Sequence, residues 1–250
     1  MTHRHALHAA LTERNLLKVI AGITNFDRDS VLSIARAAAE GGAQAIDIAA
    51  DVTLVEAVKA QTNLIVFVSS TEPARLIACA ETADVLELGN FDALYRAGIH
   101  PTGAEILGWA REVKAAIGDR VPLCVTVSGH LPVAEQKALA ADLEALGVDM
   151  LQTEGQVGPE SDDTFKALSG AVAALANTAE IRQAVSLPLL LAGGFNRVSA
   201  SFVPGSGADA LGVGKAIARH ATHAEKVAEV KAIREALEGA RAAGRGLATV

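Results

Sequence analysis

One lysine interrupts an apolar stretch near the start of the chain: Lys18 lies inside residues 16–20, which otherwise have the composition of a buried strand. Burial lowers the pKa of a lysine, and the neutral amine can then attack a carbonyl carbon to form a Schiff base, or act as a base. Alternatively, Lys18 points outward near the N-terminal mouth of the fold and reaches water, or pairs with a carboxylate such as Asp47. The sequence leaves both interpretations open.

Carboxylates recur in and after the apolar stretches that follow. Glu87 lies within one stretch, Glu154 follows another, and Asp47 and Asp51 belong to a third. Carboxylates that point into a fold need cationic or hydrogen-bonding partners. If Glu87, Glu154 and Lys18 point into one cavity, they supply the acid, base and nucleophile of a proton-transfer or carbon–carbon bond reaction. We therefore predict catalytic roles for Lys18, Asp47, Glu87 and Glu154, whereas Asp51 is expected to cap the next helix.

Hydroxyl groups end a further apolar stretch, where Thr126 and Ser128 precede His130. A Ser–His nucleophile pair would need a sharp nucleophile turn and a third partner, and the sequence has no recognisable example of either. We therefore predict that Thr126 and Ser128 hydrogen-bond a substrate. The segment Ser69–Pro73 has the residues of a helix start, which is its expected role unless Ser69 faces the cavity.

Glycines gather at two places near the end of the chain. Gly193 and Gly194 end one apolar stretch, and Gly212 and Gly214 end the next, directly before Lys215. Without a Cβ, backbone N–H groups can approach an anion, and the helix that starts near Lys215 points its positive end there. We predict that these five residues bind a phosphate group, although tight turns and a solvated lysine would give the same pattern. A dinucleotide site is disfavoured because the full glycine spacing and an acidic ribose partner are missing.

The elements that must position these residues alternate regularly along the chain. Four segments share one pattern: a small residue, then Ala or Val, then an aspartate close to an apolar strand. The aspartates of these segments are Asp47, Asp84, Asp149 and Asp209. Four other apolar runs have the length of buried strands: 16–23, 63–70, 121–128 and 187–194. Helical periodicity is expected over 5–14, 30–40, 54–59, 74–81, 104–116, 133–146, 167–184 and 223–243.

This alternation predicts an α/β fold, a (β/α)₈ TIM barrel with an extra N-terminal helix. Near-continuous apolar strands imply a parallel sheet, and eight units in 250 residues close most naturally into a barrel, with an open doubly wound sheet as the alternative. We expect one domain over 1–250, with a helical extension at 1–15 that plugs the N-terminal mouth, the barrel at 16–243 and a tail at 244–250. Functional groups in this fold lie at the C-terminal ends of the strands.

Composition and charge argue against several classes of function. The net charge of −7 and the absence of a basic stripe disfavour nucleic acid as a partner. No apolar run approaches the roughly 20 residues that span a bilayer, and the N-terminal segment lacks a signal-peptide core, so we expect a cytoplasmic protein that binds no membrane. Cys79 and Cys124 are expected to be small buried hydrophobic residues. No tightly bound metal is expected, because His3, His5 and His8 fall on the wrong side of the barrel.

Four motifs resemble a known family: Lys-Val-Ile-Ala-Gly-Ile-Thr-Asn-Phe-Asp at 18–27, Asp-Ile-Ala-Ala-Asp at 47–51, Glu-Leu-Gly-Asn-Phe-Asp at 87–92 and Gln-Thr-Glu-Gly at 152–155. They are similar to those of the hypothetical chloroplast reading frame twenty-three family, which occurs in plastids, cyanobacteria and other bacteria. The resemblance implies a phosphate-binding barrel with polar residues at strand ends: Lys18, Asn25, Asp27, Asp47, Asp51, Glu87, Asn90, Asp92, Thr126, Gln152 and Glu154. Asn25, Asn90 and Gln152 thereby join Thr126 and Ser128 as predicted substrate-binding residues.

Together these features predict an enzyme that acts on a small phosphorylated carbonyl compound, as a lyase, synthase or isomerase, with Lys18 or a carboxylate moving protons. That chemistry needs no cofactor. FMN in the same phosphate loops would instead make an oxidoreductase, and a non-catalytic sensor or scaffold for a phosphorylated metabolite is a third hypothesis. The polar segment from Gly155 to Thr164 is expected to form a lid. The Ala/Leu-rich outer helices leave room for a homo-oligomer.

Overall fold

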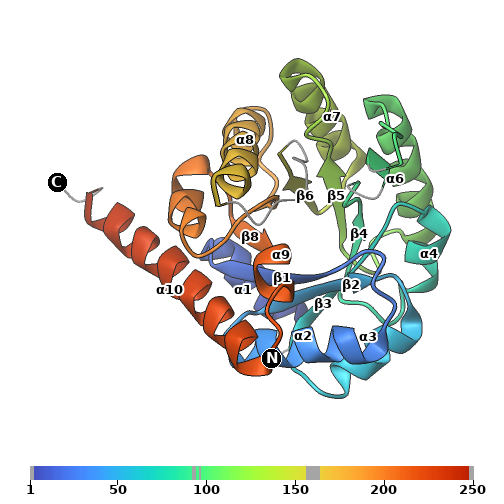
Figure 1. The fold of residues 1–250 in the computed structure, drawn as a ribbon. Coiled ribbons are helices and arrows are strands. Elements are labelled where there is room, and N and C mark those ends of the chain that lie inside the picture. Colours follow the sequence, from blue (N-terminus) through green and yellow to red (C-terminus); the bar gives the residue numbers. More distant parts are fainter. Residues whose placement is uncertain (1–2, 92–93, 96, 156–163, 248–250) are drawn as a thin grey trace.

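Eight parallel strands close into a barrel in the computed structural model, which describes residues 3–91, 94, 95, 97–155 and 164–247 (Figure 1). Neighbouring strands pair in chain order, and β1 pairs with β8 to complete the ring. The strands are β1 (Leu16–Gly22), β2 (Ala45–Ala49), β3 (Ile65–Ser70), β4 (Val85–Leu88), β5 (Leu123–Val127), β6 (Met150–Thr153), β7 (Leu189–Leu191) and β8 (Ala210–Val213). The predicted TIM barrel is confirmed, and the open doubly wound sheet is wrong.

Helices connect successive strands and most of them surround the barrel (Figure 1). They are α1 (His3–Thr12), α2 (Arg28–Glu40), α3 (Val52–Lys59), α4 (Pro73–Ala78), α6 (Gly103–Ile117), α7 (Val133–Leu146), α8 (Thr164–Arg182), the 3-10 helix η1 (Ser199–Ser206), α9 (Lys215–Ala218) and α10 (His223–Leu247). Two features differ from expectation. The β7–β8 connection is a 3-10 helix, consistent with Pro204 inside it and the left-handed Gly207 after it. In addition, α10 continues through Leu247, beyond the helix end expected at 243.

Alternation along β1 decides where Lys18 points. Leu17 and Val19 belong to the apolar layer between the barrel and its outer helices, whereas Leu16 and Ile20 belong to the cluster inside the barrel. Successive side chains of a strand point to opposite faces, so Lys18 shares the inner face with Leu16 and Ile20. The same two-residue period places a polar side chain from each of the next five strands on the inner face.

Helix α1 closes the N-terminal end of the barrel, as the sequence predicted. Its residues Leu7 and Ala10 pack into the interior cluster with Leu16, Ile65 and Met150, which lie at the N-terminal ends of their strands. The lower interior is therefore apolar and filled. A ligand for the polar upper interior must approach from the C-terminal ends of the strands.

Both cysteines behave as expected from their apolar surroundings: Cys79 and Cys124 are buried and form no disulfide. Within the described ranges, no helix combines the length and the apolar character needed to cross a membrane.

Candidate active site

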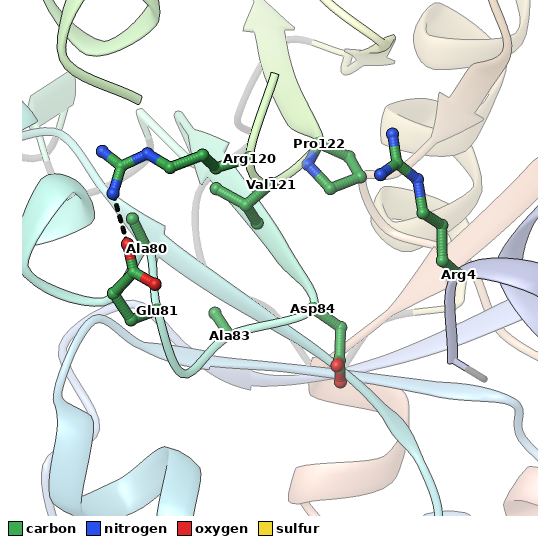
Figure 2. Close-up of a pocket in the computed structure, with 8 residues that line it drawn as sticks. All are labelled: Arg4, Ala80, Glu81, Ala83, Asp84, Arg120, Val121 and Pro122. Atoms are coloured by element: carbon green, nitrogen blue, oxygen red, sulfur yellow. Dashed lines mark hydrogen bonds and ion pairs between the residues drawn. The ribbon is translucent and has the colours of Figure 1, made fainter. Parts of the chain in front are cut away.

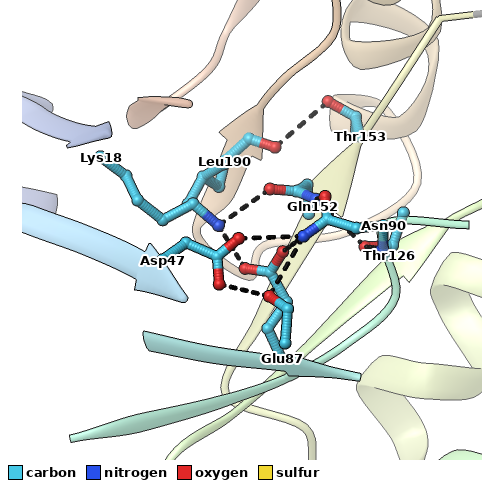
Figure 3. Close-up of polar contacts among 9 residues, drawn as sticks. Lys18, Asp47, Glu87, Asn90, Thr126, Gln152, Thr153 and Leu190 are labelled. Carbon is cyan, nitrogen blue, oxygen red and sulfur yellow. Dashed lines mark hydrogen bonds and ion pairs between the residues drawn. The ribbon is translucent and has the colours of Figure 1, made fainter. Parts of the chain in front are cut away.

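Polar side chains from six consecutive strands form one hydrogen-bonded network inside the barrel (Figure 3). Its members are Lys18 (β1), Asp47 (β2), Ser69 (β3), Glu87 (β4), Asn90 just after β4, Thr126 (β5) and Gln152 (β6). All except Asn90 are fully buried, and Asn90 is half-buried at the C-terminal end of the barrel. The structure therefore brings together six of the predicted site residues and adds Ser69, which does face the interior.

Lys18 lies at the centre of this network as a cation. It donates a hydrogen bond to Glu87 and another to Gln152, with Nζ 3.0 Å from Oε1. Burial alone lowers the pKa of Lys18, but the negative charges of Glu87 and Asp47 outweigh it, and the net shift is upward. Of the interpretations left open by the sequence, the structure favours the lysine paired with a carboxylate, with Glu87 as the contacting partner, over the neutral amine. The outward-pointing alternative is wrong.

Asp47 is a carboxyl group poised to exchange a proton near neutral pH. Its oxygens accept hydrogen bonds from Ser69 and from Asn90, whose Nδ2 lies 3.0 Å away. Burial raises the pKa of Asp47 most, Lys18 opposes this, Glu87 adds to it, and the result is about 7. A group whose pKa lies near the working pH is suited to act as a general acid or base.

Asn90 covers the network from the C-terminal side. Besides Asp47, its Nδ2 lies 3.1 Å from both Ser69 Oγ and Glu87 Oε1, and its Oδ1 accepts a hydrogen bond of 3.0 Å from Gln152. Its φ of +57° lies in the left-handed region, which asparagine tolerates better than most residues. The Asn90 amide is thus held over the two buried carboxylates by a turn whose backbone conformation few other residue types tolerate.

A glycine before Asn90 makes this turn possible. Gly89 has φ +151°, and a Cβ there would lie 2.0 Å from Thr126 Oγ1. Thr126 uses the same oxygen to accept hydrogen bonds from the Asn90 backbone, at 3.3 Å, and from Gln152, at 3.2 Å. The close approach of the Gly89 backbone to the Thr126 side chain therefore helps to position Asn90 at the C-terminal side of the network.

Glu154 belongs to a second polar group, separate from the Lys18 network. One of its carboxylate oxygens lies 2.7 Å from the Tyr95 hydroxyl and 3.3 Å from the Gly129 backbone nitrogen. The Tyr95 hydroxyl also lies 2.5 Å from Ser128 Oγ. These contacts do not join Glu154 to Lys18 and Glu87, so the single three-residue constellation is replaced by two groups. Sequence reasoning missed Tyr95, and no local pattern around it signals a role.

Aromatic rings extend this second group. The Tyr95 ring lies 4.0 Å from the His130 ring and 5.5 Å from that of His100, measured between centroids. Phe91 lies 6.4 Å from Tyr95 and 6.2 Å from Trp109, again between centroids. The residue that follows Asn90 is therefore packed between a tyrosine and a tryptophan.

Three of the five residues predicted to bind phosphate lie in loops at the C-terminal end, and a fourth begins the helix after one of these loops. Gly193 (φ +111°) and Gly194 (φ +75°) are exposed after β7, in backbone conformations that favour glycine. Gly214 is the N-cap of α9, and Lys215 is its exposed first residue. Gly212 differs, because it is buried inside the barrel, where a Cβ would lie 3.2–3.3 Å from atoms of neighbouring side chains. Its placement is that of a packing residue.

The remaining predicted residues organise loops. Asn25 donates to Ala21 O at 3.2 Å and to Ser30 Oγ at 3.1 Å, which shapes the β1–α2 loop rather than the Lys18 network. Asp27 caps α2. Asp51 caps α3, as predicted, and the hydrogen bonds it accepts from Thr53 and Leu54 lower its pKa. Asp92 and residues 156–163 of the expected lid lie outside the described residues.

Two surface hollows lie at the opposite end of the barrel. One, of about 230 Å³, is lined by Arg4, Glu81, Asp84, Arg120 and their neighbours, which precede β4 and β5 or lie on α1 (Figure 2). The other, of about 490 Å³, is lined by residues of α1 and of the segments before β2 and β3. Neither hollow is lined by residues of the network. The candidate site is therefore the place where the ionisable groups converge inside the barrel.

Solved structures with similar folds include several enzymes. A 3-hexulose-6-phosphate synthase superposes with a TM-score of 0.64 at 19% identity, covering 89% of this chain and 99% of that one. A truncated 3-deoxy-D-arabino-heptulosonate 7-phosphate synthase from Thermotoga maritima gives 0.62 at 14% identity, covering 93% and 87%. A thiamine phosphate pyrophosphorylase from Pyrococcus furiosus gives 0.59 at 21% identity, covering 92% and 98%. At these identities the likeness concerns the fold alone.

Sequence relatives are closer. An uncharacterized protein ycf23 from Cyanophora paradoxa is 34% identical over 84% of this chain and 87% of its own length, and one from Antithamnion sp. is 32% identical over 85% and 81%. A family model described as "Protein of unknown function (DUF561)" matches residues 1–243. The resemblance drawn from the four motifs is thereby confirmed. The chain belongs to the DUF561 family, together with the ycf23 proteins of these algae.

Proposed function

We propose that this protein is an enzyme that moves a proton at the carbon next to the carbonyl group of a small phosphorylated compound, within a lyase, synthase or isomerase reaction. The observation that carries the proposal is the buried Lys18 cation in contact with Glu87, beside an Asp47 carboxyl group whose pKa is about 7. Ionisable groups with shifted pKa values that converge at the C-terminal end of a barrel are typical of acid–base catalysis.

The network offers a part for each group. The Asp47 carboxylate takes the proton, the C–H electron pair forms a carbon–carbon double bond, and the carbonyl π electrons move onto the oxygen. The Lys18 ammonium and the Asn90 amide stabilise that oxyanion. Return of the proton to the former carbonyl carbon, with transfer of a hydroxyl proton between the oxygens, completes an isomerisation. Attack of the enolate carbon on a second carbonyl, or the reverse cleavage, gives a synthase or lyase.

The phosphate group is assigned to the exposed loops after β7 and β8. Gly193, Gly194 and Gly214 leave the backbone accessible, and Lys215 adds a positive charge at the start of α9. These loops are a frequent phosphate position in barrels of this type. We propose that Glu154, Tyr95 and Ser128 bind a polar group of the substrate at the mouth of the barrel. The names of two similar barrels, hexulose-6-phosphate synthase and thiamine phosphate pyrophosphorylase, agree with this ligand class.

A Schiff base at Lys18 is a less direct route, because the ammonium must first give a proton to a neighbouring carboxylate. Borohydride reduction with candidate sugar phosphates separates the two mechanisms. A mass increase localised to Lys18 would support the covalent route. An unmodified Lys18 with every compound would leave the acid–base route alone.

The test of proton transfer is exchange of substrate hydrogen in D₂O. Triose, tetrose and pentose phosphates are first ranked by thermal shift, with inorganic phosphate, FMN and the unphosphorylated sugars for comparison. Loss of the proton signal next to the carbonyl is then followed by NMR. We expect Asp47→Asn to slow exchange at least about 100-fold. Asp51→Asn is the matched control and should exchange normally, since asparagine also caps helices.

The alternatives give different results in the same experiments. Stabilisation by FMN with a bound flavin spectrum would favour an oxidoreductase. Stabilisation by a sugar phosphate without exchange or turnover would favour a sensor or scaffold. The phosphate assignment would be contradicted if no anion raised the unfolding temperature.

A further inference from the structure

Glu229 is a buried carboxylate that the proposed reaction does not use. It lies on α10, and its side chain is 2% exposed. Its Oε2 lies 3.1 Å from Arg197 Nη1 and 3.8 Å from His220 Nε2. Its Oε1 is also buried and has no hydrogen-bond partner among the described residues. Because a buried carboxylate is unfavourable without a cationic partner, its place in the fold depends on the Arg197 guanidinium; His220 Nε2 is near but beyond hydrogen-bond distance.

Arg197 comes from one of the two loops assigned to the phosphate, whereas His220 lies beyond the C-terminal end of the short helix that follows the other. Arg197 is the third residue after Gly194, in the connection from β7 to η1. His220 follows α9, which begins at Lys215. Helix α10 packs against both η1 and α9. Glu229 therefore holds Arg197 from the helix that packs against both η1 and α9.

Arg197 is held at one arm and presented to solvent. Its side chain is 62% exposed, whereas that of its partner Glu229 is 2% exposed. The contact through Nη1 engages one edge of a planar group that has five N–H donors. A guanidinium oriented in this way can bind a phosphate with its remaining donors. An ion pair that served only the surface would not require a buried carboxylate.

We infer that Arg197 supplies a second cationic side chain to the phosphate site, and that Glu229 is the positioning residue that holds Arg197. The inference rests on the proposed function, since it adds residues to the same anion site. Arg197 keeps N–H donors that Glu229 does not use, and these add to the Lys215 ammonium as donors to phosphate oxygens. The chemistry recognised is that of a phosphate monoester.

Binding of inorganic phosphate, measured by isothermal titration calorimetry, tests this inference. Arg197→Gln is expected to raise the Kd about tenfold, the size of one charge-assisted contact. Arg197→Lys should restore part of the affinity, because it keeps the charge without the planar fork. Glu229→Gln should weaken binding by a smaller factor. Arg120→Gln is the matched control, since it breaks the Arg120–Glu81 pair at the other end of the barrel and should leave the Kd unchanged.

The outcomes separate this inference from the proposed function. If the wild type binds phosphate and both Arg197→Gln and Glu229→Gln bind it equally well, the inference is contradicted while the proposed function stands. If the wild type binds neither inorganic phosphate nor any sugar phosphate, both are contradicted. A lower unfolding temperature for Glu229→Gln with unchanged affinity would show a purely structural tie. Arg197→Gln, at a mostly exposed side chain, tests the same point without endangering the fold.

Discussion

The first six strands and the last two strands fill the barrel interior in opposite ways. Each strand from β1 to β6 contributes a charged, amide or hydroxyl side chain to the interior, at the network described above. By contrast, β7 and β8 contribute Leu190, Ala210 and Gly212, and the chain after β7 adds Ala192. The polar strands form one part of the wall, and the apolar strands form the other.

This difference separates two chemical tasks. Proton transfer needs side chains whose pKa values respond to their neighbours, and the first six strands hold Lys18, Asp47 and Glu87 close enough to interact. Anion binding can be performed by backbone N–H groups, which need glycine and open space instead of polar side chains. The last two strands therefore need no polar side chains inside the barrel, because the loops that follow them would bind the anion.

Replacing Lys18 by Met should have the largest effect on stability. It removes the only cation, among the described residues, of the polar network inside the barrel. Asp47 and Glu87 would remain buried without their partner, which we expect to cost about 3–5 kcal/mol in the free energy of unfolding, measured with urea. Lys59→Met is the control, since the more accessible Lys59–Asp84 pair should contribute less than about 1 kcal/mol. Similar losses in both variants would contradict a special role for the buried pair.

Stability against pH sharpens the contrast through Asp47. Its pKa is about 7 in the folded protein against an ordinary 3.8, so between these values the folded state keeps a proton that the unfolded state has lost. The free energy of unfolding should therefore fall as pH rises through this window, by up to about 1.4 kcal/mol per pH unit from this group. Asp47→Asn should remove that contribution, and denaturant titrations of both proteins between about pH 4 and about pH 7 measure the difference. Parallel curves would mean that the carboxyl group titrates normally.

Gly212→Ala tests the apolar part. The added Cβ would lie 3.2–3.3 Å from side-chain atoms of Ile20, Leu190 and Ala192, and overpacking of this kind costs about 1–3 kcal/mol. Gly108→Ala is the opposite control, because Gly108 lies on α6 with open space around it and should gain about 0.5–1 kcal/mol. Thermal unfolding compares the two. An unchanged unfolding temperature for Gly212→Ala would show that the interior beside β8 can accommodate the added methyl group.

The smallest expected effect concerns the turn that covers the network. Asn90→Ala and Asn90→Gly lose the same side-chain hydrogen bonds, but only glycine is free of strain at φ +57°. The glycine variant should therefore be more stable than the alanine variant by about 1 kcal/mol. Equal urea midpoints would indicate that the backbone leaves the left-handed region once the amide is gone.

The fold was predictable because its signals are local and repeated. Apolar runs of strand length alternate with helical stretches, and α7 begins and ends at the predicted residues. The cap at Asp51 was predictable for the same reason, since a side chain that bonds the next turn depends on its neighbours in sequence. The 3-10 helix η1 escaped prediction because its serines, Pro204 and Gly205 give it no helical period.

The site was only partly predictable, since its chemistry depends on contacts between distant segments. The sequence offered Asp47 and Glu87 as possible neighbours of Lys18, but only the fold shows that their charges outweigh burial and raise the pKa of Lys18. Whether Glu154 shares a cavity with Lys18 and Glu87 was left open for the same reason, and the Tyr95 hydroxyl that contacts it lies in a different connection. Gly212 and Gly214 look alike in the sequence, yet only Gly212 is enclosed by the interior.

The packing around Phe91 makes the mouth of the barrel spectroscopically visible. The chain has one tryptophan and one tyrosine, Trp109 and Tyr95, and both rings lie beside Phe91, the residue after Asn90. Intrinsic fluorescence and near-ultraviolet circular dichroism therefore report on this one region and on little else. A ligand that displaces the Asn90 turn would shift the emission of Trp109, so binding at the mouth can be timed optically without attaching a label.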